Sequence, residues 1–250
     1  KTVGYNENGV LKTQWVAGDK ISVFYAKVID GVEGALTPAP TMFEITEDNL
    51  TQTIFTGQVG TDFDENATYN WYFIYDATKN APATISEDGA VTVTIGSPSQ
   101  IQVSINDNSH IGSANNCPMW GTAKNISGKM KPRVQMKHLA SLVAISVKND
   151  GFGGDIKIKD VEFSIPEVIE TDLKGKPVTD AEGNVNIIQE AFPIVGEFQF
   201  NILDGNFKAV TSGSPTSKVE LQSAYPLPKE NGNTATFYLA VRPFKETKTI

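Results

Sequence analysis

Apolar and polar residues alternate with a period of two along almost the whole chain. In residues 21–29, Ile21, Val23 and Tyr25 fall on one face of an extended strand and Phe24 falls on the other. Clusters of Gly, Pro, Asn and Asp separate such stretches, and none keeps the i, i+3, i+4 apolar spacing of a helix. The pattern predicts an all-β protein. Further strands are expected over 69–75, 91–95, 101–105, 133–147, 156–163, 196–203, 217–222 and 235–241.

The second of these stretches, residues 69–75, is a row of aromatics. Alternation places Tyr69, Trp71, Phe73 and Tyr75 on one side of a strand. Such a row is typical of the interior of a β-sandwich. An exposed platform on which a sugar ring stacks is the alternative interpretation.

Residues 133–147 form the most apolar stretch, and its apolar positions change parity near Lys137 and His138. One inserted residue has this effect, so we expect a single long strand with a β-bulge at that point. A glycine-rich segment follows, and neither a helix nor a strand tolerates it well. We place a domain boundary there, between Lys148 and Asp155.

The expected architecture is two β-sandwich domains in tandem, of Greek-key, transthyretin-like type. The N-terminal sandwich would span 1–148 and the C-terminal sandwich 149–250, and a chain of 250 residues suits two cores of this size. The polar stretch 167–186 is long for a hairpin connection and is expected to be a mobile loop. The last residues before Ile250 resemble the approach to another strand, so the second sandwich is expected to be incomplete at its C-terminal end.

Composition narrows the range of partners. The formal net charge is −8, and no local cluster of Lys and Arg indicates a phosphate-binding surface. Nucleic acid is therefore not expected as a partner. The longest apolar runs fall far short of the roughly 20 residues that cross a bilayer, so no membrane span is expected.

Residues for metal or nucleophilic chemistry are scarce. Cys117 is the only cysteine, and His110 and His138 are the only histidines, without metal-ligand spacing. No metal site, cofactor site or catalytic residue is therefore predicted, and the chain is not expected to be an enzyme. A Cys117–His138 pair stays open as an alternative, because both residue types serve nucleophilic catalysis.

Four short elements, in this order, resemble the fimbrillin family of surface pilins (type V pilins) and related adhesins. They are a W-x-x-G-D-x-I element before the first strand, an F-x-G step, a segment from Gln to M-x-G-x-A, and an H-L-x-A element. Together they cover most of the first 148 residues, whereas the second half matches only in general style. The residues that carry the resemblance are Trp15, Gly18, Asp19, Phe55, Gly57, Gln100, Met119, Gly121, His138 and Ala140.

The resemblance implies a structural role for these residues and a structural function for the protein. It implies a pilus subunit or surface adhesin at the cell surface or in the fimbrium, exported across the outer membrane by way of a lipoprotein precursor. Its partners would be other pilin subunits joined by donor-strand addition, after proteolytic removal of an N-terminal segment opens a groove for a neighbour's strand. Host or bacterial surface receptors or glycans are further expected partners. The alternative is a monomeric cell-surface glycan-binding module.

Overall fold

The structure, a computed structural model, describes residues 2–5, 11–47, 51–76, 78–112, 117–149, 156–227 and 234–244. The all-β prediction is confirmed, because the only helical segment within these ranges is the short 3₁₀ turn η1 (Ser109–Gly112). The strands are β1 (Thr2–Tyr5), β2 (Leu11–Gln14), β3 (Lys20–Ile29), β4 (Val32–Glu33), β5 (Thr37–Pro38), β6 (Phe43–Glu44), β7 (Thr68–Tyr75), β8 (Ala90–Ile95), β9 (Ser99–Gln102), β10 (Met119–Ser127), β11 (Lys137–His138), β12 (Ser141–Lys148), β13 (Ile156–Ser164), β14 (Val168–Ile169), β15 (Ile187–Gln189), β16 (Val195–Asn201), β17 (Asn206–Ser214), β18 (Thr216–Leu227) and β19 (Thr234–Val241).

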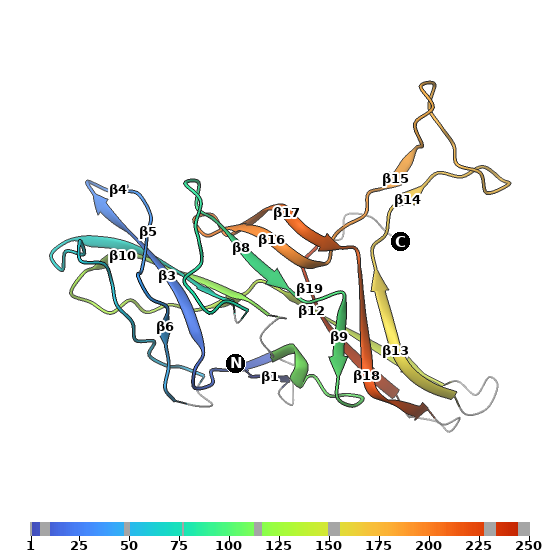
Figure 1. The fold of residues 1–250 in the computed structure, drawn as a ribbon, viewed down its shortest axis with the longest axis horizontal. Coiled ribbons are helices and arrows are strands. Elements are labelled where there is room, and N and C mark those ends of the chain that lie inside the picture. Colours follow the sequence, from blue (N-terminus) through green and yellow to red (C-terminus); the bar gives the residue numbers. More distant parts are fainter. Residues whose placement is uncertain are drawn as a thin grey trace.

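The first core lies between two sheets. A seven-stranded sheet in the order β11-β10-β7-β3-β4, with β5 and β6 also paired to β3, faces the three-stranded sheet β17-β16-β8 (Figure 1). Phe24 and Tyr72 from the first sheet meet Phe198 and Phe200 from the second, and all four side chains are buried. Each aromatic ring removes a large apolar area from water, so this interface is a major source of stability.

The opposite face of the seven-stranded sheet carries the aromatic row. Tyr69, Trp71, Phe73 and Tyr75 are all buried there, under the connections that follow β5 and β6. The row is therefore buried, as the alternation in 69–75 predicts, but in a further core that connections cover instead of a second sheet.

A second core fills the space between the two-stranded sheet β12-β19 and the three-stranded sheet β13-β18-β9. Phe237 and Leu239 of β19 pack there with Val219 and Leu221 of β18, and all four are buried. The other sheet pairings among the described residues are two small hairpins, β1-β2 and β14-β15.

Strand pairing crosses the expected boundary at residue 148 in three places. The N-terminal part contributes β8 to β16, β9 to β18 and β12 to β19. The β9–β18 pair is parallel and the other two are antiparallel. The two parts of the chain thus share three sheets, while the glycine-rich segment over 150–155 lies outside the described residues. The division into two domains stays a prediction.

Two local expectations need correction. The single long strand expected over 133–147 is two strands, β11 in the first core's sheet and β12 in the second core's sheet. The change of parity marks the crossing between the cores, and Leu139 between the two strands is buried in the first core. The strand expected over 101–105 starts earlier and ends at Gln102.

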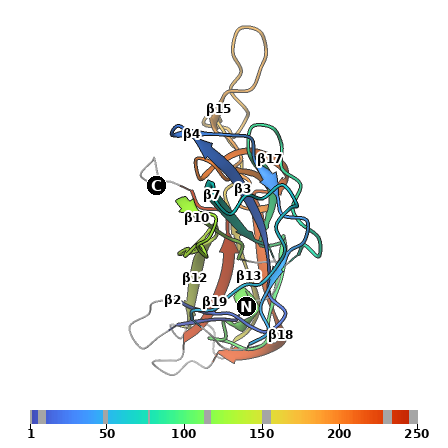
Figure 2. The same ribbon diagram turned by 90° about the vertical axis from the view of Figure 1, so that its left-hand side faces the viewer.

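The stretch expected as a mobile loop forms an arm built of hydrogen-bonded turns; its mobility stays a prediction. It starts from the end of β13, includes β14 and β15, and projects from the body of the molecule in both views (Figures 1 and 2).

Candidate functional site

The second core is open along one side. Within the described part of the chain, β12 pairs with β19 alone and β13 pairs with β18 alone, so each strand has one edge with no partner strand. An unpaired edge presents backbone N–H and C=O groups that another strand is able to pair with. We name the side formed by β12 and β13 the open side.

Burial of the inward-facing side chains shows how the open side arises. Val219 and Leu221 of the middle strand β18 are 0% and 1% exposed, whereas Val161 and Phe163 of β13 and Ile145 of β12 are only half-buried. The two-stranded sheet β12-β19 faces the three-stranded sheet β13-β18-β9, and the smaller sheet leaves β13 incompletely covered. One further strand beside β12 would cover these apolar side chains.

The ring of Phe244, which follows β19, covers part of this surface. Its centroid lies 6.2 Å from that of Phe163 and 6.1 Å from that of Phe192. Phe244 itself remains 41% exposed, so it closes the open side only in part.

The opposite side of the second core is closed by side chains instead of by a strand. Gln100 of β9 accepts a hydrogen bond from the Ala240 N–H (3.2 Å) and donates to the Ala240 carbonyl (3.1 Å). Gln102 likewise accepts from the Tyr238 N–H (3.0 Å) and donates to the Thr236 carbonyl (2.9 Å). The two glutamine amides thus imitate the ladder of a neighbouring strand.

The same edge of β19 is completed by residues beyond β9. The side chain of Asn106 accepts from the Thr236 N–H (3.0 Å), and the His110 Nε2 lies 2.8 Å from the Tyr238 carbonyl. Burial lowers the pKa of His110, although the bond to Tyr238 acts against this. We name this set the side-chain ladder: Gln100, Gln102, Asn106 and His110.

The side-chain ladder reverses the expected orientation of β9. Gln100 and Gln102 are buried, whereas Ile101 and Val103 are 60% and 53% exposed. Alternation of apolar and polar residues in the strand expected over 101–105 predicts Ile101 and Val103 on the inner face. This prediction is wrong, because the buried edge of β19 needs hydrogen-bond partners. Gln100, one of the motif residues, thus satisfies a strand edge.

Three aromatic side chains and one carboxylate meet at the C-terminal end of the aromatic row. The rings of Phe55 and Tyr75 pack edge-on against Trp15, with centroids at 5.0 and 5.3 Å. The Tyr75 hydroxyl donates to the Asp19 carboxylate (2.8 Å), whose other oxygen accepts from the Val16 N–H (2.9 Å). Burial, together with this carboxylate, raises the pKa of Tyr75. Trp15, Asp19 and Phe55 therefore fix the entry into β3.

The motif glycines meet three different needs. Gly18 has a φ of +85°, which favours glycine in the turn before β3. A side chain at Gly57 would lie 2.1 Å from the ring of Phe43, and one at Gly121 would lie 2.5 Å from Val134. Both positions therefore allow neighbouring chain segments to approach closely.

Folding brings Cys117 and His138 together, although 20 residues separate them. The Cys117 Sγ lies 2.9 Å from the His138 Nδ1, and the thiol is buried. Met119 is buried in the seven-stranded sheet and is the register partner of His138. Ala140, which follows Leu139, is half-buried against the first core. The structure thus brings together the pair that the sequence leaves open, with the thiol buried and the imidazole half-buried.

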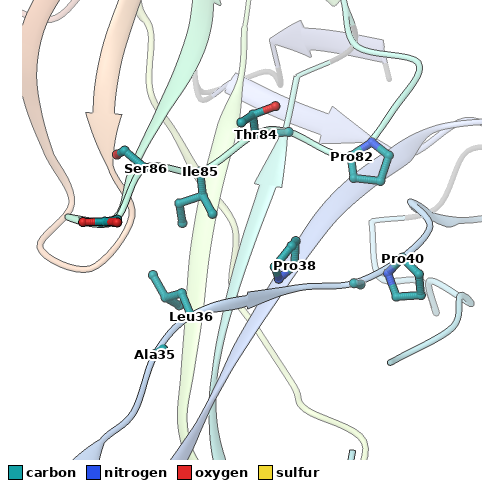
Figure 3. Close-up of a pocket in the computed structure, with 11 residues that line it drawn as sticks. Ala35, Leu36, Pro38, Pro40, Pro82, Thr84, Ile85 and Ser86 are labelled. Atoms are coloured by element: carbon teal, nitrogen blue, oxygen red, sulfur yellow. The ribbon is translucent and has the colours of Figure 1, made fainter. Parts of the chain in front are cut away.

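A shallow hollow of about 800 Å³ lies beside β5 (Figure 3). Figure 3 shows Leu36 and Ile85 facing each other across it, with Pro38, Pro40 and Pro82 around them. Its single charged lining residue is Glu87, so the hollow offers a small apolar surface without a convergent polar set.

The three tryptophans of the chain take part in packing. Trp15 and Trp71 are buried, and Trp120 is half-buried with its indole N–H donating to the Ile202 carbonyl (3.0 Å). None of them forms an exposed platform.

Within the described ranges, no group of three or more His, Cys, Asp and Glu side chains is placed to hold a metal ion. No helix among the described residues has the length and apolar character needed to cross a membrane. The chain matches no family model, no curated protein and no solved structure.

Proposed function

We propose that this chain is a structural protein of the cell surface, a fimbrillin-like pilus subunit or adhesin, that assembles when a strand from another copy adds to β12. The open side carries the proposal. It combines an unpaired strand edge with half-buried apolar side chains on the facing strand β13, as strand addition requires.

The side-chain ladder supports the choice of edge. On that side the edge of β19 is already occupied by Gln100 and Gln102, so an incoming strand finds no free groups there. Within the second core, strand addition is therefore directed to the open side.

The energetics favour a tethered or well-fitted strand. Four alternate apolar side chains contribute roughly 1.5–3 kcal/mol each on burial. Ordering about eight residues costs about 1–2 kcal/mol of backbone entropy apiece. Because these contributions nearly cancel, ladder hydrogen bonds and the fit of side chains decide the outcome, and a high effective concentration stabilises the assembled state.

One feature of the architecture supports the sandwich part of this proposal: the first and the second core each lie between their own pair of facing sheets. Domains in tandem of the Greek-key, transthyretin-like type remain part of the proposal, although three strand pairings join the two parts of the chain. The motif residues also support the family assignment, because Trp15, Asp19, Phe55 and Gly121 all serve the packing of one sheet.

Size-exclusion chromatography before and after proteolytic trimming of an N-terminal segment tests the proposal. The family resemblance implies that trimming produces oligomers, and these should persist at high salt because apolar burial and backbone pairing hold them. Val161→Lys places a charge on the open side and should prevent oligomers. Val210→Lys, at a position of β17 that is 41% exposed, is the matched control and should leave them unchanged.

Circular dichroism and thermal melting establish that both variants are folded. A trimmed protein that stays monomeric at every concentration would contradict strand addition and leave a monomeric adhesin or a glycan-binding module. Oligomers unaffected by Val161→Lys would place the contact elsewhere.

A further inference from the structure

The arm formed by 167–190 is organised around a closed ring of three backbone hydrogen bonds. The N–H of Glu170 donates to the Asn186 carbonyl (2.8 Å), that of Asn186 to the Val178 carbonyl (2.9 Å), and that of Val178 to the Glu170 carbonyl (2.9 Å). The three residues follow one another at intervals of eight. The ring joins the stem of the arm to two hairpins, one over 171–177 and one over 179–185.

The two hairpins repeat one turn. In the first, the Asp172 carboxylate accepts from the N–H groups of Lys174 and Lys176 (2.8 and 2.9 Å). In the second, Asp180 accepts in the same way from the N–H groups two and four residues on (3.0 and 2.8 Å). A glycine with positive φ completes each turn. These local bonds hold the arm in a defined shape without a core of its own.

The arm is acidic. Six acidic side chains and two lysines give 167–190 a formal charge of −4. No ion pair involves these acids within the described part of the chain, and hydrogen bonds from the Asn184 side chain and backbone lower the pKa of Asp180, which favours its ionised form. Leu173, at the tip of the first hairpin, is fully exposed.

A second charged surface has the opposite sign, and it corrects the expectation that Lys and Arg form no local cluster. Residues 119–140 contain five cationic side chains and no acid, in a chain whose net charge is −8. Lys124 lies 3.2 Å from Glu33, while the four other cations are exposed and have no ion-pair partner among the described residues. Met130 is 64% exposed among them. We name this surface the basic segment; its unpaired cations are Lys129, Lys131, Arg133 and Lys137.

The acidic arm and the basic segment lie far apart along the long axis. Figure 1, drawn with the longest axis horizontal, places β10 at one end and the arm beyond β14 and β15 at the other. They are therefore poorly placed to pair within one molecule. Two different surfaces that fit each other form a heterologous contact, which continues from copy to copy.

We propose that the acidic arm of one copy docks on the basic segment of a second copy. The contact builds on the proposed assembly by strand addition but uses different surfaces. Opposite charges provide the attraction, and each surface adds one bare apolar side chain, Leu173 on the arm and Met130 on the basic segment. A second copy is favoured over another anionic partner because the same chain carries an exposed surface of opposite sign and similar magnitude.

Charge swapping in the full chain tests the contact by sedimentation velocity. Glu182→Lys with Glu190→Lys reverses two arm charges, neither of which makes a side-chain hydrogen bond among the described residues. Lys129→Glu with Lys131→Glu reverses two charges of the basic segment. An equimolar mixture of the two variants, as well as the wild type, should associate at low ionic strength, whereas each variant alone should remain monomeric.

Salt dependence separates this contact from strand addition. Association through the arm should fall at least tenfold as salt rises from about 0.02 M to about 0.5 M, because the Debye length shortens to a few ångströms. Strand-added oligomers should persist at high salt. The salt-sensitive association and the salt-resistant oligomers are therefore scored separately, and whichever is absent identifies the proposal that fails. Glu47→Lys with Glu87→Lys changes net charge equally outside the arm and should leave association unchanged.

Three results would overturn the proposal. One is wild-type association that survives both double reversals, and another is a mixture of the two variants that stays monomeric. The third is association unchanged in the variants while Lys129→Glu with Lys131→Glu abolishes binding to heparin, which would assign the basic segment to an anionic glycan.

Discussion

Replacing Gln100 by Ala removes the centre of the side-chain ladder. The amide of Gln100 satisfies both backbone groups of Ala240, a residue that is 1% exposed. The Ser217 hydroxyl also accepts from this amide, but it keeps its own bond to the Ser97 carbonyl (2.8 Å). The substitution therefore leaves one buried donor and one buried acceptor without a partner.

The expected loss follows from these two groups. An unsatisfied buried polar group costs about 1–3 kcal/mol, so Gln100→Ala should lower the free energy of unfolding by about 2–6 kcal/mol. Urea denaturation followed by circular dichroism measures the change. Gln199→Ala, at an exposed position of β16, is the control and should cost less than about 0.5 kcal/mol. A loss at Gln100 no larger than at Gln199 would refute the account of the ladder.

Gln100→Glu gives a second test with a predicted sign. A carboxylate would still accept from the Ala240 N–H, but it would place an unprotonated oxygen against the Ala240 carbonyl. The protonated acid donates there, so the folded state should raise the pKa of this carboxyl group above its unfolded value. Stability should then be greatest below the unfolded pKa and fall as pH rises towards the folded pKa. A variant equally stable at acidic and neutral pH would contradict this.

Three further changes test the packing and the titration. Gly121→Ala should cost about 1–3 kcal/mol in urea denaturation, because the added methyl group would lie 2.5 Å from Val134. Burial and nearby carboxylates raise the pKa values of Tyr72 and Tyr75 above the ordinary 10.0. The stability that the two neutral phenols contribute is therefore complete below pH 10.0 and declines above it. Titration followed by ultraviolet absorbance should show both phenols ionising at a higher pH than a free tyrosine. His138→Ala should lower stability by about 1–3 kcal/mol, as its buried contact with Cys117 is lost, and should be measured by thermal melting.

The sequence predicted those strands in which burial alone decides the orientation. In β3 and β7, alternate residues point to opposite faces of the seven-stranded sheet, one set into the first core and the other into the cluster around the aromatic row. The pattern of 21–29 and 69–75 shows this directly. β9 departs from the rule because the amide of Gln100 satisfies the buried edge of β19, which leaves Ile101 exposed. That need depends on β19, which lies more than a hundred residues further along the chain.

The candidate site was less accessible to sequence reasoning. The expectation of an incomplete second sandwich rests on residues near Ile250, and 245–250 lie outside the described residues. The open side instead follows from how many strands each sheet holds, which a local pattern does not encode. The arm had a signal that was missed: Thr171–Asp172 and Thr179–Asp180 begin two similar turns at an interval of eight residues.

The pairing of β8 with β16 also implies a delay during biosynthesis. Ile95 has Gly196 as its partner, so about a hundred residues must be made after β8 before the first core is covered. Ribosomes add about 5–20 residues per second, which makes this interval about 5–20 s. During that time Phe24 and Tyr72 lack the rings of Phe198 and Phe200, and the edges of the early strands stay available to other chains. The interval between translation of β8 and of β16 is therefore when the nascent chain most needs protection from aggregation.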